Sequence, residues 1–225
     1  MKKNFDAPPK DLKFINDLRD SSLDICPMCG APRTSSLDHY LSKEYYPEYT
    51  VFSKNLVPAC KCNSSKGKKV TGSIVALERI LHPYYDDCLN DRLLSCLIEQ
   101  APALPVVSIT IQTLPTDQPI DESIKFHVEN IVKPSGLVKW LDTLWTRVWN
   151  SPSSVINTMP KGDVVTEAEL RDAVIDQLDR VGRRYGSANN WESVFLHGVI
   201  NSPGCIEWIS SRHNYLVNNP LANDL

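Results

Sequence analysis

The residues of this chain that could do chemistry lie between positions 26 and 67. In chain order they are Cys26, Cys29, Asp38, His39, Asn55, Cys60, Cys62, Asn63, Lys66 and Gly67. Pairs of cysteines a few residues apart are typical of structural zinc sites. A neutral histidine can take a proton from water near pH 7, and carboxylate and amide oxygens are ligands that Mg²⁺ accepts. A base, a divalent cation and rigid placement of both are what hydrolysis of a phosphodiester requires.

The same stretch resembles the HNH endonuclease family in its zinc-stapled ββα-metal form. The resemblance is carried by the segments LDHYLSKEYYPE and NLVPACKCNSSKG. Family members read Asp-His-hydrophobic, then Asn-Leu, then Cys-Asn-x2-Lys-Gly, with a Cys-x2-Cys upstream. The match covers about residues 26–69, less than a fifth of the chain. It implies an HNH endonuclease that hydrolyses phosphodiester bonds in DNA, or in structured RNA.

The resemblance implies a role in cleavage for four of these side chains. His39 would be the general base that activates water. Asp38 and Asn63 would bind the catalytic cation, Mg²⁺ or Mn²⁺. Asn55 would hold the loop that bears His39 through hydrogen bonds to the backbone, which is a positioning role.

The resemblance also implies a structural zinc ion and contacts to nucleic acid. The zinc ligands would be Cys26, Cys29, Cys60 and Cys62. The lysines near the backbone phosphates would be Lys66, Lys68 and Lys69.

The second cysteine pair departs from the family pattern. Only one residue separates Cys60 from Cys62, whereas zinc half-sites normally leave two to four residues between their ligands. Either the turn is tightened and all four cysteines still bind zinc, or another residue replaces Cys62. His82 and Cys88 are the candidates, and we expect the turn to absorb the lost residue.

Composition and charge fit an ordinary globular protein with a basic N-terminal third. The net charge is −3 overall. Residues 1–69 hold 12 of the 24 Lys and Arg and 8 of the 27 Asp and Glu, which gives +4 there and −7 in the remainder. A basic head is compatible with phosphate contacts. No apolar stretch approaches a membrane span or a signal peptide, so we expect a cytoplasmic protein, and seven cysteines there favour metal over disulfides.

The elements that must position these residues indicate an α+β fold. A short amphipathic helix is expected at 8–18, a Gly-ended turn at 26–30 and a helix from 66 to 81. Residues 87–100 are expected to be helical or irregular. A strand pair is expected at 103–114 and 122–132, because both stretches are rich in β-branched residues. Helices are expected at 136–149, 166–185, 190–200 and 203–218, the second of them opened by a capping box at Thr166 and Glu169.

We expect this order of elements to form two domains. Residues 1–81 would be the nuclease module, with its N-terminal helix and zinc site. Residues 82–225 would be a β-hairpin followed by a mainly helical, partner-binding region.

A looser resemblance covers most of the chain. YYPEYTVFSKNLVPAC, then HPYYDD, then a β pair and helices, is similar to the HNH subunit of Septu-type anti-phage systems. Those subunits work beside an SMC-like ABC ATPase, and some such pairs accompany retrons. The resemblance implies the nuclease effector subunit of an anti-phage defence complex, with such an ATPase and nucleic acid as partners and no membrane.

Two other functions and one local question stay open from the sequence. The chain could be a zinc-stapled module that binds nucleic acid or proteins without catalysis, or a nuclease that is silent until a partner ATPase recruits it. Four tyrosines near the motif could stack on nucleic acid or pack over the zinc loops. They are Tyr40, Tyr45, Tyr46 and Tyr49.

Overall fold

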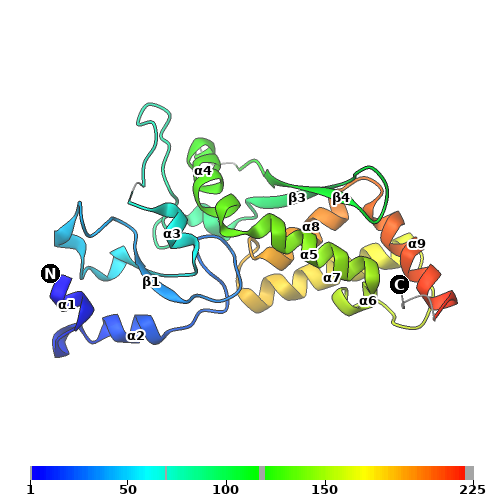
Figure 1. Ribbon diagram of the computed structural model, residues 1–225, viewed down its shortest axis with the longest axis horizontal. Coiled ribbons are helices and arrows are strands. Elements are labelled where there is room, and N and C mark those ends of the chain that lie inside the picture. The colour runs from blue at the N-terminus through cyan, green and yellow to red at the C-terminus, as the bar shows by residue number, and fades with distance from the viewer. Residues whose placement is uncertain (1, 69, 117–119, 221–225) are drawn as a thin grey trace. The chain divides into compact units, whose positions relative to one another are not determined.

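The chain folds into two compact units, each made from two separate stretches of sequence. A computed structural model describes residues 2–68, 70–116 and 120–220 and has an α+β architecture (Figure 1). Unit 1 is formed by Met1–Leu93 and Pro115–Leu137, and unit 2 by Leu94–Leu114 and Val138–Leu225. The expected boundary after residue 81 falls inside unit 1, because the first stretch of that unit continues to Leu93. The segment Pro115–Leu137 also belongs to unit 1.

Unit 1 combines short helices with a two-stranded antiparallel sheet. Its helices are α1 (Lys2–Asp6), α2 (Phe14–Asp20), α3 (Cys62–Lys66) and α4 (Asp121–His127), and its strands are β1 (Ser36–His39) and β2 (Leu56–Ala59). Short turns of other helical types are Lys10–Leu12, Pro47–Tyr49, Ser53–Asn55, Asp87–Asn90, Val128–Val132 and Lys133–Ser135. A cluster of Phe5, Ile15 and Leu56 joins α1 and α2 to the sheet through buried apolar contacts.

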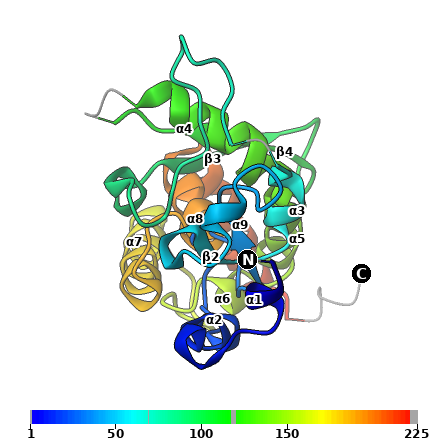
Figure 2. The ribbon, with the colours of Figure 1, turned by 90° about the vertical axis from the view of Figure 1, so that its left-hand side faces the viewer.

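The two strands of the sheet in unit 1 carry residues of the predicted motif and pair them in a fixed register. Asp38 lies opposite Val57, and His39 lies opposite Leu56. Every residue of β2 is buried, as expected for a strand made only of apolar residues. The helix α3 begins shortly after β2 ends, and the order strand, strand, helix therefore occupies residues 36–66 (β1 and α3 are labelled in Figure 1, β2 and α3 in Figure 2).

The expected helix at 66–81 is wrong. The helix α3 ends at Lys66, where Gly67 takes a positive φ of 61°, which ends a helix and suits glycine. The residues that follow form a loop closed by an antiparallel bridge between Thr71 and Arg79. Figure 1 shows this loop extending away from α3 and α4, and its tip exposes Ile74 and Val75.

The expected strand at 122–132 is also wrong, because this segment is helical. Asp121 opens α4, and a π-helical turn at Val128–Val132 continues it. Ile124, Val128 and Ile131 are all buried and recur at the spacing of one helix face. The β-branched residues suggested a strand, but this spacing and the acidic first turn favour a helix.

The hairpin of unit 2 therefore uses a different partner strand. The strand β3 (Leu94–Gln100) pairs antiparallel with β4 (Val107–Thr113) in a continuous register from Leu94 opposite Thr113 to Gln100 opposite Val107. A β carbon at Gly198 would lie 2.2 Å from Cys96 Sγ. The helix that contains Gly198 can therefore approach β3 closely only because that position has no side chain.

The helices expected in the C-terminal region are confirmed. They are α5 (Leu137–Asn150), α7 (Glu167–Tyr185), α8 (Trp191–Asn201) and α9 (Cys205–Asn218), and a short α6 (Pro152–Val155) joins them. The capping box is present, since Thr166 accepts from the Glu169 amide and the Glu169 side chain accepts from the Thr166 amide. Within the described part of the chain, none of the helices has the length and apolar character that crossing a bilayer demands.

Candidate metal centre and active site

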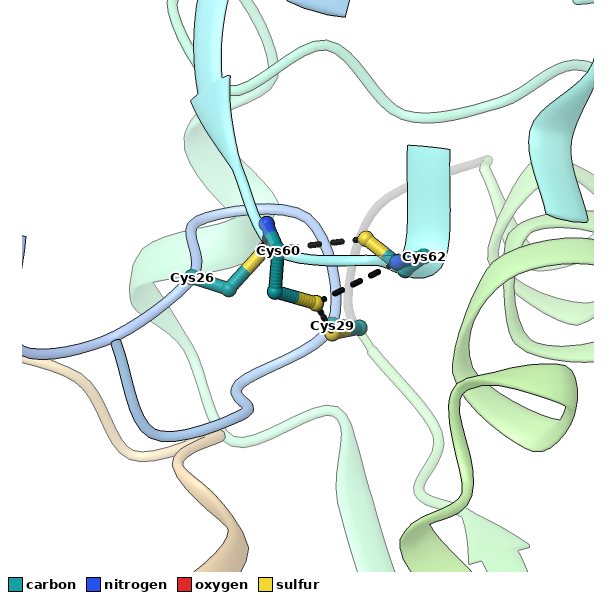
Figure 3. A group of neighbouring side chains, drawn as sticks. All are labelled: Cys26, Cys29, Cys60 and Cys62. Carbon is teal, nitrogen blue, oxygen red and sulfur yellow. Dashed lines mark hydrogen bonds between the residues drawn. The ribbon is translucent and has the colours of Figure 1, made fainter. Parts of the chain in front are cut away.

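Four cysteines of unit 1 converge on one point. Cys26 and Cys29 lie in a turn closed by a hydrogen bond from the Gly30 amide to the Cys26 carbonyl at 2.9 Å, while Cys60 follows β2 and Cys62 begins α3. All four Sγ atoms lie within 4.8 Å of one another (Figure 3). The sequence brought these residues together as two pairs, and the fold places the pairs face to face.

The geometry of the cluster suits a tetrahedral zinc ion. The Sγ atoms of Cys26 and Cys62 are 3.7 Å apart, and those of Cys29 and Cys60 are 3.4 Å apart. Four thiolates at about 2.3 Å from zinc would be separated by roughly 3.8 Å. The backbone amide of Cys60 donates to Cys26 Sγ at 3.4 Å. The four cysteines can therefore hold a zinc ion.

The local electrostatics favour a thiolate at Cys26. Hydrogen bonds from the thiols of Cys29, Cys60 and Cys62 hold the pKa of Cys26 far below its usual range. Burial opposes this shift, but the surrounding donors outweigh it. Zinc binds the thiolate form of cysteine. A deprotonated Cys26 could therefore coordinate the ion directly.

The shortened Cys-x-Cys spacing is absorbed by the turn between β2 and α3. Cys62 reaches the cluster from the first position of α3, and its amide donates to Cys60 Sγ at 3.3 Å. His82 is engaged elsewhere, since its Nδ1 accepts from the Tyr84 amide at 3.1 Å and its ring lies 4.2 Å from the Tyr40 ring. The geometry thus gives neither His82 nor Cys88 a place among the sulfur atoms.

His39 lies at the end of β1 with one ring nitrogen fixed. Its Nε2 is 3.0 Å from the Thr50 carbonyl, and because a carbonyl only accepts, Nε2 carries the proton and Nδ1 carries the lone pair. The ring also packs against Phe5, with the centroids 4.3 Å apart. Burial lowers the pKa of His39, and the positive charges of Lys43 and Lys66 lower it further. The imidazole is therefore neutral near pH 7, as a general base requires.

Asn55 is buried between two backbone segments. Its Oδ1 accepts from the Leu41 amide at 2.7 Å, and its Nδ2 donates to the carbonyls of Leu41 and Tyr49 at 3.1 and 3.0 Å. These bonds tie the end of β1 to the segment that carries Thr50, which in turn binds His39. They are the contacts that the expected positioning role of Asn55 requires.

Lys66 does not lie where the expected phosphate contact would need it. Its ammonium is buried, 2.7 Å from Asp38 Oδ2, and it donates to the carbonyls of His39 and Tyr40 at 2.5 and 2.8 Å. The cause is the spacing along α3, which turns Lys66 inward toward β1. Burial raises the pKa of Asp38, and the charge of Lys66 and its hydrogen bond act against that rise. Lys66 therefore serves as the counter-ion of Asp38.

Asn63, the second expected ligand of the cation, forms its hydrogen bond with a residue other than Asp38. Asn63 Nδ2 donates to Ser36 Oγ at 2.9 Å, so its amide faces the start of β1 rather than the carboxylate. Ser36 and Asp38 share one face of the strand, and Asn63 and Lys66 share one face of α3. The helix thus lies along this face of β1.

Two lysines of the predicted phosphate contact remain. Lys68 is exposed and forms an ion pair with Glu44. Lys69 lies outside the described residues.

His127 supports the cysteine turn, a role that the sequence analysis did not predict. It is fully buried, its Nε2 donates to the Met28 carbonyl at 2.6 Å, and its Nδ1 accepts from the Leu81 amide at 3.1 Å. Burial lowers the pKa of His127 to about 4. The apolar helical spacing around it was a signal for a buried position, but its two partners are distant in sequence.

Comparison with known proteins adds one partial relative. No family model matches the chain, and no solved structure matches it. Protein ea31 of Escherichia phage lambda is 38% identical over 78 residues, which are 32% of this chain and 25% of that protein. The chain thus spans about a quarter of the length of this curated relative. The likeness does not show a family, and the name of the relative states no activity.

Proposed function

We propose that this protein is a metal-dependent HNH endonuclease that hydrolyses phosphodiester bonds in DNA or structured RNA. The observation that carries the proposal is the state of His39. Its Nε2 hydrogen is held by the Thr50 carbonyl, so Nδ1 can accept a proton from water. Asp38 precedes it directly on β1, and metal-assisted hydrolysis uses an imidazole base together with a carboxylate that binds the cation.

The residues present fit a hard cation by their chemistry. Asp38 offers a carboxylate and Asn63 an amide oxygen, and Mg²⁺ binds through one or two such groups while it keeps several waters. The ion pair with Lys66 occupies one oxygen of Asp38, and a carboxylate has about four lone-pair positions. A cation bound there would neutralise charge on the scissile phosphate and on the leaving oxygen.

The other residues of the site act by holding the base in place. Asn55 fixes the backbone on both sides of the loop that ends at Thr50, and Thr50 orients the imidazole of His39. The four cysteines, with zinc bound, would fix the turn from β2 into α3 and therefore the position of Asn63. In this proposal the segment 36–66 is the ββα-metal module in its zinc-stapled form.

The role in an anti-phage defence complex rests on the resemblance to Septu-type subunits alone. We propose an SMC-like ABC ATPase as the partner, and co-purification of such an ATPase with the tagged chain from its native host would support it. Recovery of the chain alone under conditions that preserve complexes would count against it.

The nuclease is tested with purified, zinc-replete protein. Plasmid DNA, single-stranded DNA and a folded RNA are incubated with Mg²⁺ or Mn²⁺ and with EDTA. We expect metal-dependent cleavage, and a loss of about 10²- to 10⁴-fold in His39→Ala. His197→Ala, which removes a half-buried imidazole from unit 2, is the matched control and should keep its activity. Full activity in a folded His39→Ala protein would exclude the mechanism.

A second function is favoured by one specific observation. The polar atoms of Asp38 and Asn63 already have partners within the protein, Lys66 and Ser36. A zinc-stapled module that binds nucleic acid or proteins without catalysis would keep those contacts permanently. Binding of nucleic acid without cleavage in either metal, both alone and with the proposed ATPase added, would establish this alternative in place of the nuclease.

A further inference from the structure

An exposed group of aromatic rings lies in the segment between His39 and Asn55. We call Tyr45, Tyr46, Tyr49 and Phe52 the aromatic surface. Their exposed fractions are 66%, 40%, 41% and 47%. The sequence left open whether four tyrosines stack on nucleic acid or pack over the zinc loops. Of these four, only Tyr40 is buried. Rings of this size are normally buried or held in an interface, so their exposure within eight residues of sequence calls for a partner.

The aromatic surface is fixed to the candidate base by the backbone. The Tyr49 carbonyl accepts from Asn55 Nδ2 at 3.0 Å, and the carbonyl of the next residue, Thr50, accepts from His39 Nε2. The rings of Tyr49 and Phe52 lie edge to face with centroids 6.0 Å apart. The backbone that carries Tyr49 and Phe52 is therefore tied to the segment that holds His39.

Positive charge accompanies the rings and favours an anionic partner. Arg19 and Lys43 lie over the Phe5 ring at 4.4 and 5.3 Å from its centroid, and the same ring packs on His39. Lys54 lies over the Tyr84 ring at 4.9 Å. The segment also contains Glu44 and Glu48, and Lys68 neutralises Glu44 through its ion pair. Besides burial, the positive charges of Lys43, Lys66 and Arg19 lower the pKa of His39, so cations lie close to the candidate base and favour an anionic ligand there.

We propose that the aromatic surface stacks on unpaired nucleobases of the strand whose phosphate lies at His39. This inference rests on the proposed function and narrows its substrate to nucleic acid with a single-stranded segment. Base faces are open to side chains only where bases are unpaired, and exposed aromatic rings beside cations are the usual means of binding them. A protein partner would also use the rings, but the neighbouring cations give it no comparable reason to dock beside His39.

Fluorescence anisotropy in the non-cleaving His39→Ala background tests the proposal. The probes are oligothymidylate and oligouridylate of about 12 nucleotides, and a duplex of the same length. The double substitution Tyr45→Leu/Phe52→Leu keeps the side chains apolar but removes two ring faces. We expect it to weaken binding of the single strands about 5- to 100-fold and to leave duplex binding unchanged. The two single-stranded probes show whether the sugar matters.

Two control variants make the result specific. Tyr45→Phe keeps the ring and should bind as tightly as the parent. Tyr215→Leu removes an exposed ring from α9 in unit 2 and should also bind normally. Equal affinity of the parent and the double variant for single strands would overturn the proposal, and so would a loss that is equally large for the duplex.

Cleavage by otherwise wild-type protein separates this inference from the proposed function. Ring-dependent binding without cleavage in Mg²⁺ or Mn²⁺ would contradict the nuclease and, with it, the substrate role proposed here. Cleavage of single-stranded segments that is unaffected by Tyr45→Leu/Phe52→Leu would keep the nuclease and contradict the aromatic surface.

Discussion

The cysteine cluster and the candidate active site both use α3 (Cys62 and Asn63), but they differ in how complete they are. Around the cluster, four sulfur atoms lie within 4.8 Å and point at one another. Around β1, Asp38 Oδ2 is bound by Lys66, whereas Asn63 Oδ1 accepts from Ser64 Oγ at 3.2 Å and Asn63 Nδ2 donates to Ser36, so the two ligand oxygens face different protein groups. The four sulfur atoms of the cluster are close enough to bind one ion together. The polar atoms of the candidate active site are instead already bound by neighbouring side chains.

The difference follows from the chemistry of the side chains. Thiols form only weak hydrogen bonds, so neighbouring cysteines gain most from a shared metal ion. A half-buried carboxylate is costly without an opposite charge, and Lys66 supplies that charge on the same face of α3. A cation at Asp38 must therefore share the carboxylate with Lys66, whereas zinc at the cysteines would be held by four sulfur atoms that already lie within 4.8 Å of one another. Four substitutions test this contrast.

The largest effect is expected from loss of a zinc ligand. Cys62→Ser should lower the zinc content of purified protein well below one ion per chain, and unit 1 should lose most of its resistance to proteolysis. Structural zinc contributes on the order of 10 kcal/mol in small zinc-bound modules. Zinc analysis and limited proteolysis measure both. Cys88→Ser changes a buried cysteine outside the cluster and should retain zinc. Normal zinc content in Cys62→Ser would show that three cysteines suffice.

Removal of Lys66 should destabilise the other site without affecting zinc. In Lys66→Met the Asp38 carboxylate loses its counter-ion, and the free energy of unfolding should fall by about 3 kcal/mol, measured by urea denaturation. Lys68→Met, at an exposed ion pair, should leave the free energy of unfolding nearly unchanged. Adding Asp38→Asn to Lys66→Met should restore part of the loss. A Lys66→Met protein as stable as the parent would show that the pair is dispensable.

His127 should make stability depend on pH. Its pKa is about 4 in the folded protein and near 6.5 in an unfolded chain. Below pH 6.5 the unfolded chain binds a proton that the folded protein excludes, so this stabilisation is present above pH 6.5 and is lost as pH falls toward 4. The loss is about 3 kcal/mol. Acid also releases zinc, so the quantity to measure is the difference in the free energy of unfolding between the parent and His127→Gln. This difference should become smaller as pH falls from 6.5 to 4. A constant difference would contradict the buried neutral imidazole.

The smallest effect on stability is expected at Asn63. Asn63→Ala removes one partly exposed hydrogen bond to Ser36, so the free energy of unfolding should change by about 1 kcal/mol or less and zinc content should not change. Under the proposed function, cleavage should nevertheless fall about 100-fold or more. Ser36→Ala breaks the same hydrogen bond and should keep its activity. Equal activities in the two variants would remove Asn63 from the cation site.

Much of the zinc site was predictable from sequence, and part of the fold was not. The cysteines stand in turns rich in Pro and Gly, and local spacing sufficed to pair them. The helices α5, α7, α8 and α9 follow apolar periodicity and caps that are visible in the sequence. The segment 122–132 was assigned to a strand because its β-branched content outweighed a helical spacing that was also present.

Lys66 shows the limit for the site. A lysine in a basic run is usually exposed, and residue types alone do not tell which lysine of the run turns inward. Its burial depends on α3 lying along one face of β1, where Asp38 and two free carbonyls are within reach of the ammonium. That arrangement is a property of packing, and a pattern of residue types does not contain it.

The sequence by itself determined the chemical inventory: four cysteines in two turns, an Asp-His pair, two asparagines and the helices of the C-terminal region. Only the tertiary structure decided which of these groups meet. It brought Cys62 to the cluster in spite of the short spacing, gave Asp38 a buried counter-ion, and placed His127 under the cysteine turn from nearly a hundred residues away. The physical reason is that local spacing fixes turns and helix faces, whereas hydrogen bonds and ion pairs between distant segments form only once packing has excluded water from them.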